Sequence, residues 1–223
     1  MKTSYFIISF LVVIFAATLL NQYRLYGSFS GVYVVVVWFL ILNILVNYWE
    51  FILWKKIDLI EATSNKYYQT YINEKATPLA QFMNQKMSFS RFFSASFWSG
   101  LWVAYSMYDR SYADKKSFGF AIDVGNGLST LIPCLILHIG FSYHFFEAKV
   151  FGIIMLALMW QMAYGTLVYW FSFIVNKRYE LLSKRQNFNI IVGSNISWLI
   201  FSLVGIYAAI RLIFDNNFSV FGI

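Results

Sequence analysis

The chain has few of the residues that soluble metalloenzymes and secreted proteins depend on. Its single cysteine, Cys134, excludes an internal disulfide framework and a thiolate metal site. Its two histidines, His138 and His144, argue against a zinc or di-iron centre, so no metal and no cofactor are predicted. Only 12% of the 223 residues are charged, about half the share of an average soluble domain, whereas 60% are hydrophobic and 22% aromatic. This composition predicts an integral membrane protein.

The net charge of +7 does not indicate a nucleic-acid partner. The basic residues fall between apolar runs, as in the loops that flank membrane helices, and no basic patch remains for a phosphate backbone. The bilayer itself is therefore the first partner that the sequence predicts.

Five segments have the roughly 20 mostly apolar residues that a transmembrane helix needs. They cover residues 5–20, 32–54, 118–143, 150–175 and 190–214. Residues 55–117, between the second and third spans, are polar at first and then rich in aromatic residues, which indicates a re-entrant or interfacial piece. A sixth crossing at 92–108 is the alternative. The predicted fold is an all-α bundle of five transmembrane helices, forming one membrane domain over residues 1–223.

The distribution of basic residues predicts the orientation of this multi-pass protein. With five spans, only Arg24, Lys149 and Arg211 lie on one side, which leaves 14 of the 17 Lys and Arg residues on the other. The positive-inside rule then places the N-terminus in the cytoplasm. The membrane would be a bacterial inner membrane or the endoplasmic reticulum.

Two carboxylates, Glu50 and Asp123, fall inside predicted spans, where a charge costs roughly 2.5–3.5 kcal/mol on insertion scales. Further polar or aromatic side chains fall at a similar depth in the fourth and fifth spans. These are Gln161, Tyr164, Thr166, Asn195 and Trp198. Because polar groups in lipid face the bundle interior, a shared pocket is predicted.

Other interpretations remain open for the individual residues. Glu50 can extend to the interface, and Asp123 can interact with the dipole at a helix N-terminus. The side chains of Gln161, Thr166 and Asn195 can also serve as ordinary hydrogen bonds between helices.

Two carboxyl groups that lie close together in a low dielectric do not both ionise readily, so one keeps its proton. Such a pair can protonate one carbon and deprotonate another. The rings of Trp102, Tyr164 and Trp198 would stabilise an intervening carbocation. The chemistry predicted is a proton-driven rearrangement of a lipid-soluble alkene that enters from the bilayer.

Three stretches carry a resemblance to a known family. Residues 101–112 (LWVAYSMYDRSY), followed by Phe118 and Asp123, resemble the EXPERA family, which includes the emopamil-binding protein, a sterol Δ8–Δ7 isomerase, and the sigma-2 receptor. Residues 160–169 (WQMAYGTLVY) and 195–198 (NISW) look like two further motifs of that family. The resemblance covers about residues 30–214. It implies Glu50 and Asp123 as catalytic residues and the following substrate-binding residues: Trp102, Tyr105, Asp109, Asn126, Gln161, Tyr164, Thr166, Asn195 and Trp198.

The chain also departs from the family pattern. Val46 stands where the isomerase has a histidine, Asp123 replaces a glutamate, Asn126 a threonine and Thr166 an aspartate, and Arg110-Ser111 reverses the usual order. The two acids are kept while the surrounding residues have changed.

The leading hypothesis is therefore a sterol or isoprenoid double-bond isomerase. One alternative is a protein that binds or transports a sterol or a cationic amphiphile without turnover. A membrane terpene cyclase, suggested by the run Asn47-Tyr48-Trp49-Glu50, and a chaperone-like membrane partner are the others. A homodimer is left open.

Overall fold

The computed structural model describes residues 1–74 and 77–223. Five long helices dominate it: α1 (Thr3–Tyr26), α2 (Gly31–Lys55), α7 (Phe118–Tyr143), α8 (Ala148–Val175) and α10 (Gly193–Asp215). All five are long and apolar enough to cross a membrane, the last when the short helical pieces from Lys184 to α10 are counted with it. No strand occurs among the described residues. The predicted all-α multi-pass bundle is confirmed; four predicted spans lie within one of these helices, and the fifth begins in the π-helical turn (Asn187–Val192) that leads into α10.

Local sequence explains where the long helices begin and end. Gly27 has φ = 75° and ends α1, because glycine adopts this left-handed conformation without a steric cost. Ser30 precedes α2, and its hydroxyl accepts a hydrogen bond from the Tyr33 amide at 3.2 Å. Ser117 caps α7 in the same way through the Phe120 amide at 3.1 Å.

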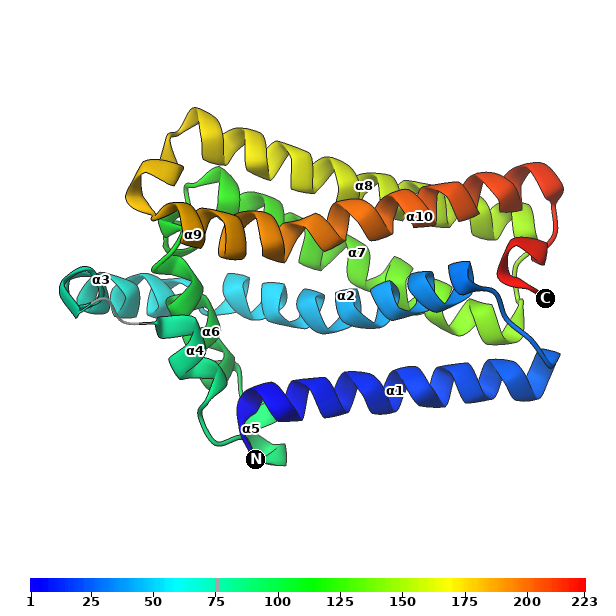
Figure 1. The fold of residues 1–223 in the computed structure, drawn as a ribbon, viewed down its shortest axis with the longest axis horizontal. Helices are drawn as coiled ribbons and strands as arrows, with labels where there is room; N and C mark the ends of the chain where they lie inside the picture. Colours follow the sequence, from blue (N-terminus) through cyan, green and yellow to red (C-terminus); the bar gives the residue numbers. More distant parts are fainter. Residues whose placement is uncertain (75–76) are drawn as a thin grey trace.

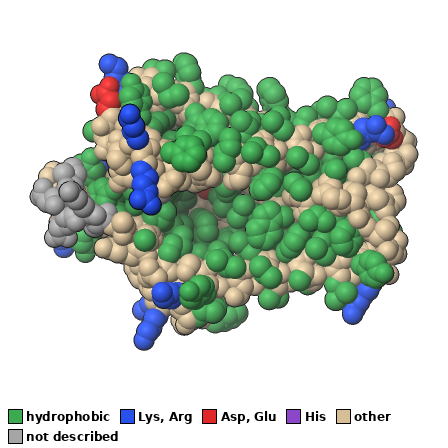
Figure 2. Space-filling model, viewed as in Figure 1, with side chains coloured by type: hydrophobic (Ala, Val, Ile, Leu, Met, Phe, Trp, Pro, Cys, Tyr) green, Lys and Arg blue, Asp and Glu red, His purple; other side chains and the backbone are tan. Residues whose placement is uncertain are grey.

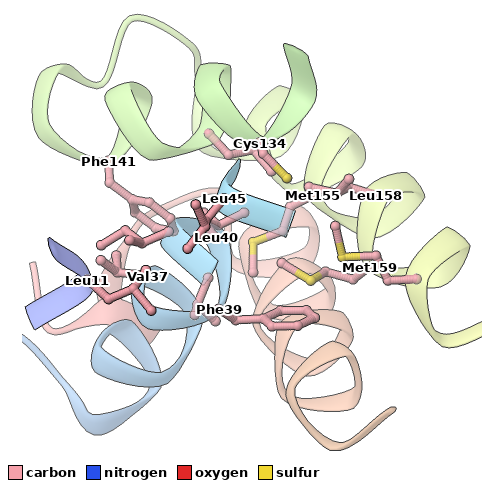
Figure 3. Packing of buried hydrophobic residues seen from close by; sticks show 14 of the residues in the cluster. Leu11, Val37, Phe39, Leu40, Leu45, Cys134, Phe141, Met155, Leu158 and Met159 are labelled. Carbon is pink, nitrogen blue, oxygen red and sulfur yellow. The ribbon is translucent and has the colours of Figure 1, made fainter. Parts of the chain in front are cut away.

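The five long helices run along the length of the molecule, with the two chain termini at opposite ends (Figure 1). α8 and α10 pack side by side, whereas α1 lies at the edge and is mostly exposed. The core lies between α2, α7, α8 and α10. Figure 3 shows Phe39 and Leu40 of α2 close to Phe141 of α7 and to Met155 and Met159 of α8.

The segment between α2 and α7 contains α3 (Ile57–Glu74), α4 (Pro78–Met83), α5 (Phe89–Phe92), α6 (Ala95–Ser106) and the 3₁₀ turn η1 (Arg110–Ala113). α4 and α6 cross the end of the bundle rather than running along it (Figure 1). α6 has 12 residues, so it is about 18 Å long and too short for the roughly 30 Å hydrocarbon core. The alternative of a sixth crossing at 92–108 is therefore wrong.

Indole N–H groups attach α6 to its surroundings. Trp98 Nε1 donates to the Phe92 carbonyl at 2.6 Å, and Trp102 Nε1 donates to the Trp49 carbonyl at 2.7 Å. The second bond joins α6 to the last turns of α2, so the crossing segment is held directly against the bundle.

The outer surface has the distribution expected in a bilayer. The long side of the molecule is covered by hydrophobic side chains, and Lys and Arg gather at its two ends (Figure 2). Large apolar residues are exposed on the sides of the helices, among them Ile132, Phe171, Leu203 and Phe214. An exposed apolar belt of this kind indicates a lipid environment.

Two glycines allow α8 and α10 to approach closely. A Cβ atom at Gly152 would lie 2.9 Å from the Ala209 carbonyl oxygen of α10, and one at Gly205 would lie 2.6 Å from Met159 Cγ of α8. Small residues at such positions let helix backbones pack together in membranes.

We expect Gly152→Ala to destabilise the bundle by about 1–3 kcal/mol, because the new methyl group meets backbone that cannot move aside cheaply. The matched control is Gly125→Ala on α7, where a Cβ atom meets nothing within 4 Å. This control should be neutral or stabilising by up to about 1 kcal/mol. Thermal unfolding of the purified protein in detergent compares them, and equal stabilities would contradict the packing account.

Candidate functional site

A cavity lies inside the end of the bundle that α4 and α6 cross. Its volume is about 240 Å³. Residues of α2, α4, α6, α7, α8 and α10, and one residue of η1, line it. Figure 2 shows a hollow near this end of the apolar face, with an acidic side chain at its bottom.

Eight of the predicted site residues line this one cavity. They are Glu50, Trp102, Tyr105, Asp123, Asn126, Thr166, Asn195 and Trp198. They come from five helices separated by up to about 150 residues in sequence. The predicted shared pocket therefore exists, and both carboxyl groups belong to it.

Glu50 is buried on α2 and has an orphaned oxygen. Its Oε2 has no hydrogen-bond partner among the described residues, and none of the described residues that line the cavity is Lys, Arg or His. Gly127 on α7 gives it room, since a Cβ atom there would lie 2.5 Å from Glu50 Cβ and 3.1 Å from Oε2. Glu50 also lies close enough to Asp123 for the two charges to repel each other.

Asp123 lies on α7 and lines the cavity together with Tyr112 of η1, close enough for the two groups to interact. Burial raises the pKa of the Tyr105 phenol to about 12. Burial, and after it the charge of Asp123, also raises the pKa of Tyr112 above its ordinary value. Both phenols therefore keep their protons at neutral pH, so each can donate a hydrogen bond to a carboxylate in the cavity.

Hydrogen bonds fix the remaining polar walls. Trp198 Nε1 donates to Asn43 Oδ1 at 3.0 Å, and the Asn195 side-chain amide donates to the Ile191 carbonyl at 2.8 Å. The Thr166 hydroxyl donates to the Met162 carbonyl within α8 at 3.0 Å. These partners hold the rings and amides in place around the two acids.

Three predicted substrate-binding residues do not line the cavity. Tyr164 is 53% exposed on the outer face of α8 and stacks on Trp160, so its predicted place in the pocket is wrong. Gln161 lies beside the cavity and donates to Asn126 Oδ1 at 3.1 Å, which is the hydrogen-bond role left open above. Asp109 is buried behind the cavity in an ion pair with Arg178. The charge of Asp109 is therefore balanced by Arg178 rather than by a substrate.

The structure also adds residues that the sequence did not single out as site residues. Trp49, Tyr112 and Tyr169 all line the cavity, and Trp49 Nε1 is buried without a partner among the described residues. Tyr112 and Tyr169 belong to the stretches that carry the family resemblance. Trp49 is adjacent to Glu50, but nothing in its helical spacing distinguishes it from a packing residue.

The site defines a class of protein: a multi-pass, all-α membrane protein with an internal cavity whose described lining contains two carboxyl groups and no Lys, Arg or His. Among the described residues, no three His, Cys, Asp or Glu side chains gather as a metal site would require. No family model matches the chain, and neither a curated protein nor a solved structure matches it.

The two buried acids Glu50 and Asp109 should respond oppositely to loss of charge. We expect Glu50→Gln to leave the thermal unfolding temperature unchanged or to raise it, because Glu50 forms no ion pair with a described residue and its replacement strands no buried positive charge. Asp109→Asn should destabilise the protein by about 3–5 kcal/mol, since it leaves Arg178 without its buried partner. Thermal unfolding of both isosteric variants in the same detergent measures this, and equal losses would contradict the distinction.

Proposed function

We propose that the protein is a membrane enzyme that moves a double bond in a sterol or another isoprenoid lipid by protonation and deprotonation. The observation that carries this proposal is that Glu50 and Asp123 share one cavity, with no Lys, Arg or His among the described residues that line it. Two carboxyl groups in different surroundings can share the roles of acid and base.

The chemistry balances with these two groups alone. The carboxyl group that carries the proton transfers it to one alkene carbon, and the π electrons form the new C–H bond. The neighbouring carbon becomes a cation. The carboxylate then removes a proton from a carbon on the far side of the cation, and the electrons of that C–H bond form the shifted double bond. One proton enters the lipid and one leaves, and proton transfer between the two carboxyl groups, with exchange against solvent, restores both groups before the next turnover.

The contacts of the two acids suggest which one begins protonated. The Tyr112 hydroxyl lies near Asp123, and a hydrogen bond donated by it would favour the carboxylate form of Asp123. Glu50 Oε2 has no donor among the described residues. In the proposed reaction Glu50 supplies the proton and Asp123 removes one.

Aromatic rings would stabilise the cation between the two steps. Trp49, Trp102 and Trp198 line the cavity, and indole faces attract a cation through their quadrupole. The mouth opens in the apolar side of the molecule, so a lipid could enter and leave without crossing water. The resemblance to the EXPERA family supports the same chemistry, although the changed residues leave the particular lipid open.

The orientation is proposed from charge. The end of the bundle that holds the cavity also carries the N-terminus and the crossing segment, where most of the basic residues lie. The positive-inside rule would place this end in the cytoplasm.

A second candidate function is binding or transport of a cationic amphiphile without turnover. The unpaired oxygen of Glu50 favours it, because a ligand amine would supply the missing donor. In this case the amide variants of Glu50 and Asp123 would mainly weaken amine ligands rather than abolish a reaction.

Mass spectrometry of lipids incubated with the purified protein in D₂O tests the proposal. We expect one Δ8-sterol or isoprenoid in a panel to return with a shifted double bond and one deuterium. Glu50→Gln and Asp123→Asn should each lower this rate at least about 100-fold, because each removes a proton-transfer group, while neutral lipid still binds.

Tyr164→Phe is the matched control, since Tyr164 faces outward from the same bundle, and it should turn over normally. Normal turnover by both amide variants would refute the acid–base assignment. Bound lipid without conversion would favour the binding protein, and a cyclised isoprenoid would favour a cyclase.

A further inference from the structure

A buried ion pair lies directly behind the cavity. Arg178, which follows α8, places its Nη1 at 2.9 Å from Asp109 Oδ1 and 3.0 Å from Oδ2. The Asp109 side chain is fully buried and that of Arg178 is 14% exposed. The Arg178 Nη2 also donates to the Ser172 hydroxyl at 3.1 Å, so the guanidinium joins α8 to the turn that carries Asp109.

Asp109 also forms hydrogen bonds with two segments that line the cavity, α8 and η1. It accepts a hydrogen bond from the Tyr169 hydroxyl of α8 at 2.9 Å. It also accepts one from the Ser111 amide at 3.0 Å, which caps η1. Because Tyr169 lines the cavity and η1 carries Tyr112, one carboxylate sets the position of both phenols.

The start of α7 rests on the same turn. The Ser117 hydroxyl donates to the Ser111 carbonyl at 2.5 Å. Gly119 packs so closely that an added Cβ atom would overlap the Ser111 hydroxyl and lie 3.4 Å from Arg178 Nη1. Asp123 lies one turn further along α7, so its distance from Tyr112 depends on how η1 is held.

We propose that Arg178 is a positioning residue for the acid–base pair: through Asp109 it holds η1, which carries Tyr112 and supports the start of α7, so that the Tyr112 hydroxyl is placed to donate to Asp123. The role in catalysis rests on the function proposed above, whereas the positioning itself does not. Arg178 also neutralises Asp109, whose charge would otherwise act on Asp123 from behind. One acid is thus confined to a structural role and two remain available for proton transfer.

Infrared difference spectroscopy of the full-length protein in lipid tests the positioning without a substrate. The carboxyl C=O band of Asp123, recorded after acidification, is identified by its loss in Asp123→Asn. We expect Tyr112→Phe to move this band to higher frequency, because the carboxyl loses a hydrogen-bond donor. Arg178→Gln should move it in the same direction, and the combined variant should add no further shift.

Arg211→Gln is the matched control, because Arg211 pairs with Asp215 at the opposite end of the bundle. It should leave the band in place. If Arg178→Gln does not fold, two other variants replace it in the measurement: Arg178→Lys, and the double variant Asp109→Asn with Arg178→Gln. Neither leaves a buried carboxylate without a positive partner. Each should shift the band part of the way or fully.

A band that stays at the wild-type position in every folded Arg178 variant would overturn the proposal, as would a band that Tyr112→Phe does not move. Where a lipid is turned over, Arg178→Gln should lower kcat at least tenfold with little change in KM. If no lipid is turned over, the proposed function fails, while the infrared result still decides the positioning role.

Discussion

The structure depends on one constraint: hydrocarbon offers no hydrogen bonds, so polar side chains in the spans must find partners inside the bundle. Trp198 meets this need across helices through Asn43, and Gln161 does so through Asn126. Glu50 does not, because one of its oxygens is buried without a donor among the described residues. The unpaired oxygen of Glu50 lowers the stability of the fold. Interaction with a molecule that enters the cavity therefore explains this residue better than a role in folding does.

Comparison of Asp109 with Glu50 shows how pairing separates structure from chemistry. Both acids are buried at the same end of the bundle, and both are costly to desolvate. Asp109 has a guanidinium, a phenol and a backbone amide as donors, so its charge is balanced and its geometry fixed. The charge that acts on Glu50 is that of another acid, Asp123, and its Oε2 has no donor among the described residues. A proton can move at Glu50 without breaking an ion pair, whereas at Asp109 it cannot.

The spans and the acids could be predicted because each is a local signal: about 20 apolar residues, and a carboxylate within them. The misplaced residues needed information that is not local. α8 is apolar on every side, so its spacing could not indicate that Tyr164 faces lipid while Tyr169 faces inward. Asp109 and Arg178 form their ion pair although they lie 69 residues apart in the sequence. Tyr112 lies on a 3₁₀ turn, which shows no helical periodicity. Only the packed bundle brings these groups together.

The depth of the acids constrains the lipid that they could act on. Glu50 lies five residues before the end of α2 and Asp123 five residues after the start of α7, which is about 7.5 Å along each helix. A lipid whose polar group stays at the membrane boundary would therefore present carbons a few bonds below that group. A double bond deep in an extended chain would lie beyond both acids. Under the function proposed above, this depth would suit a compact isoprenoid, such as a ring system, better than a long unsaturated tail held by its headgroup.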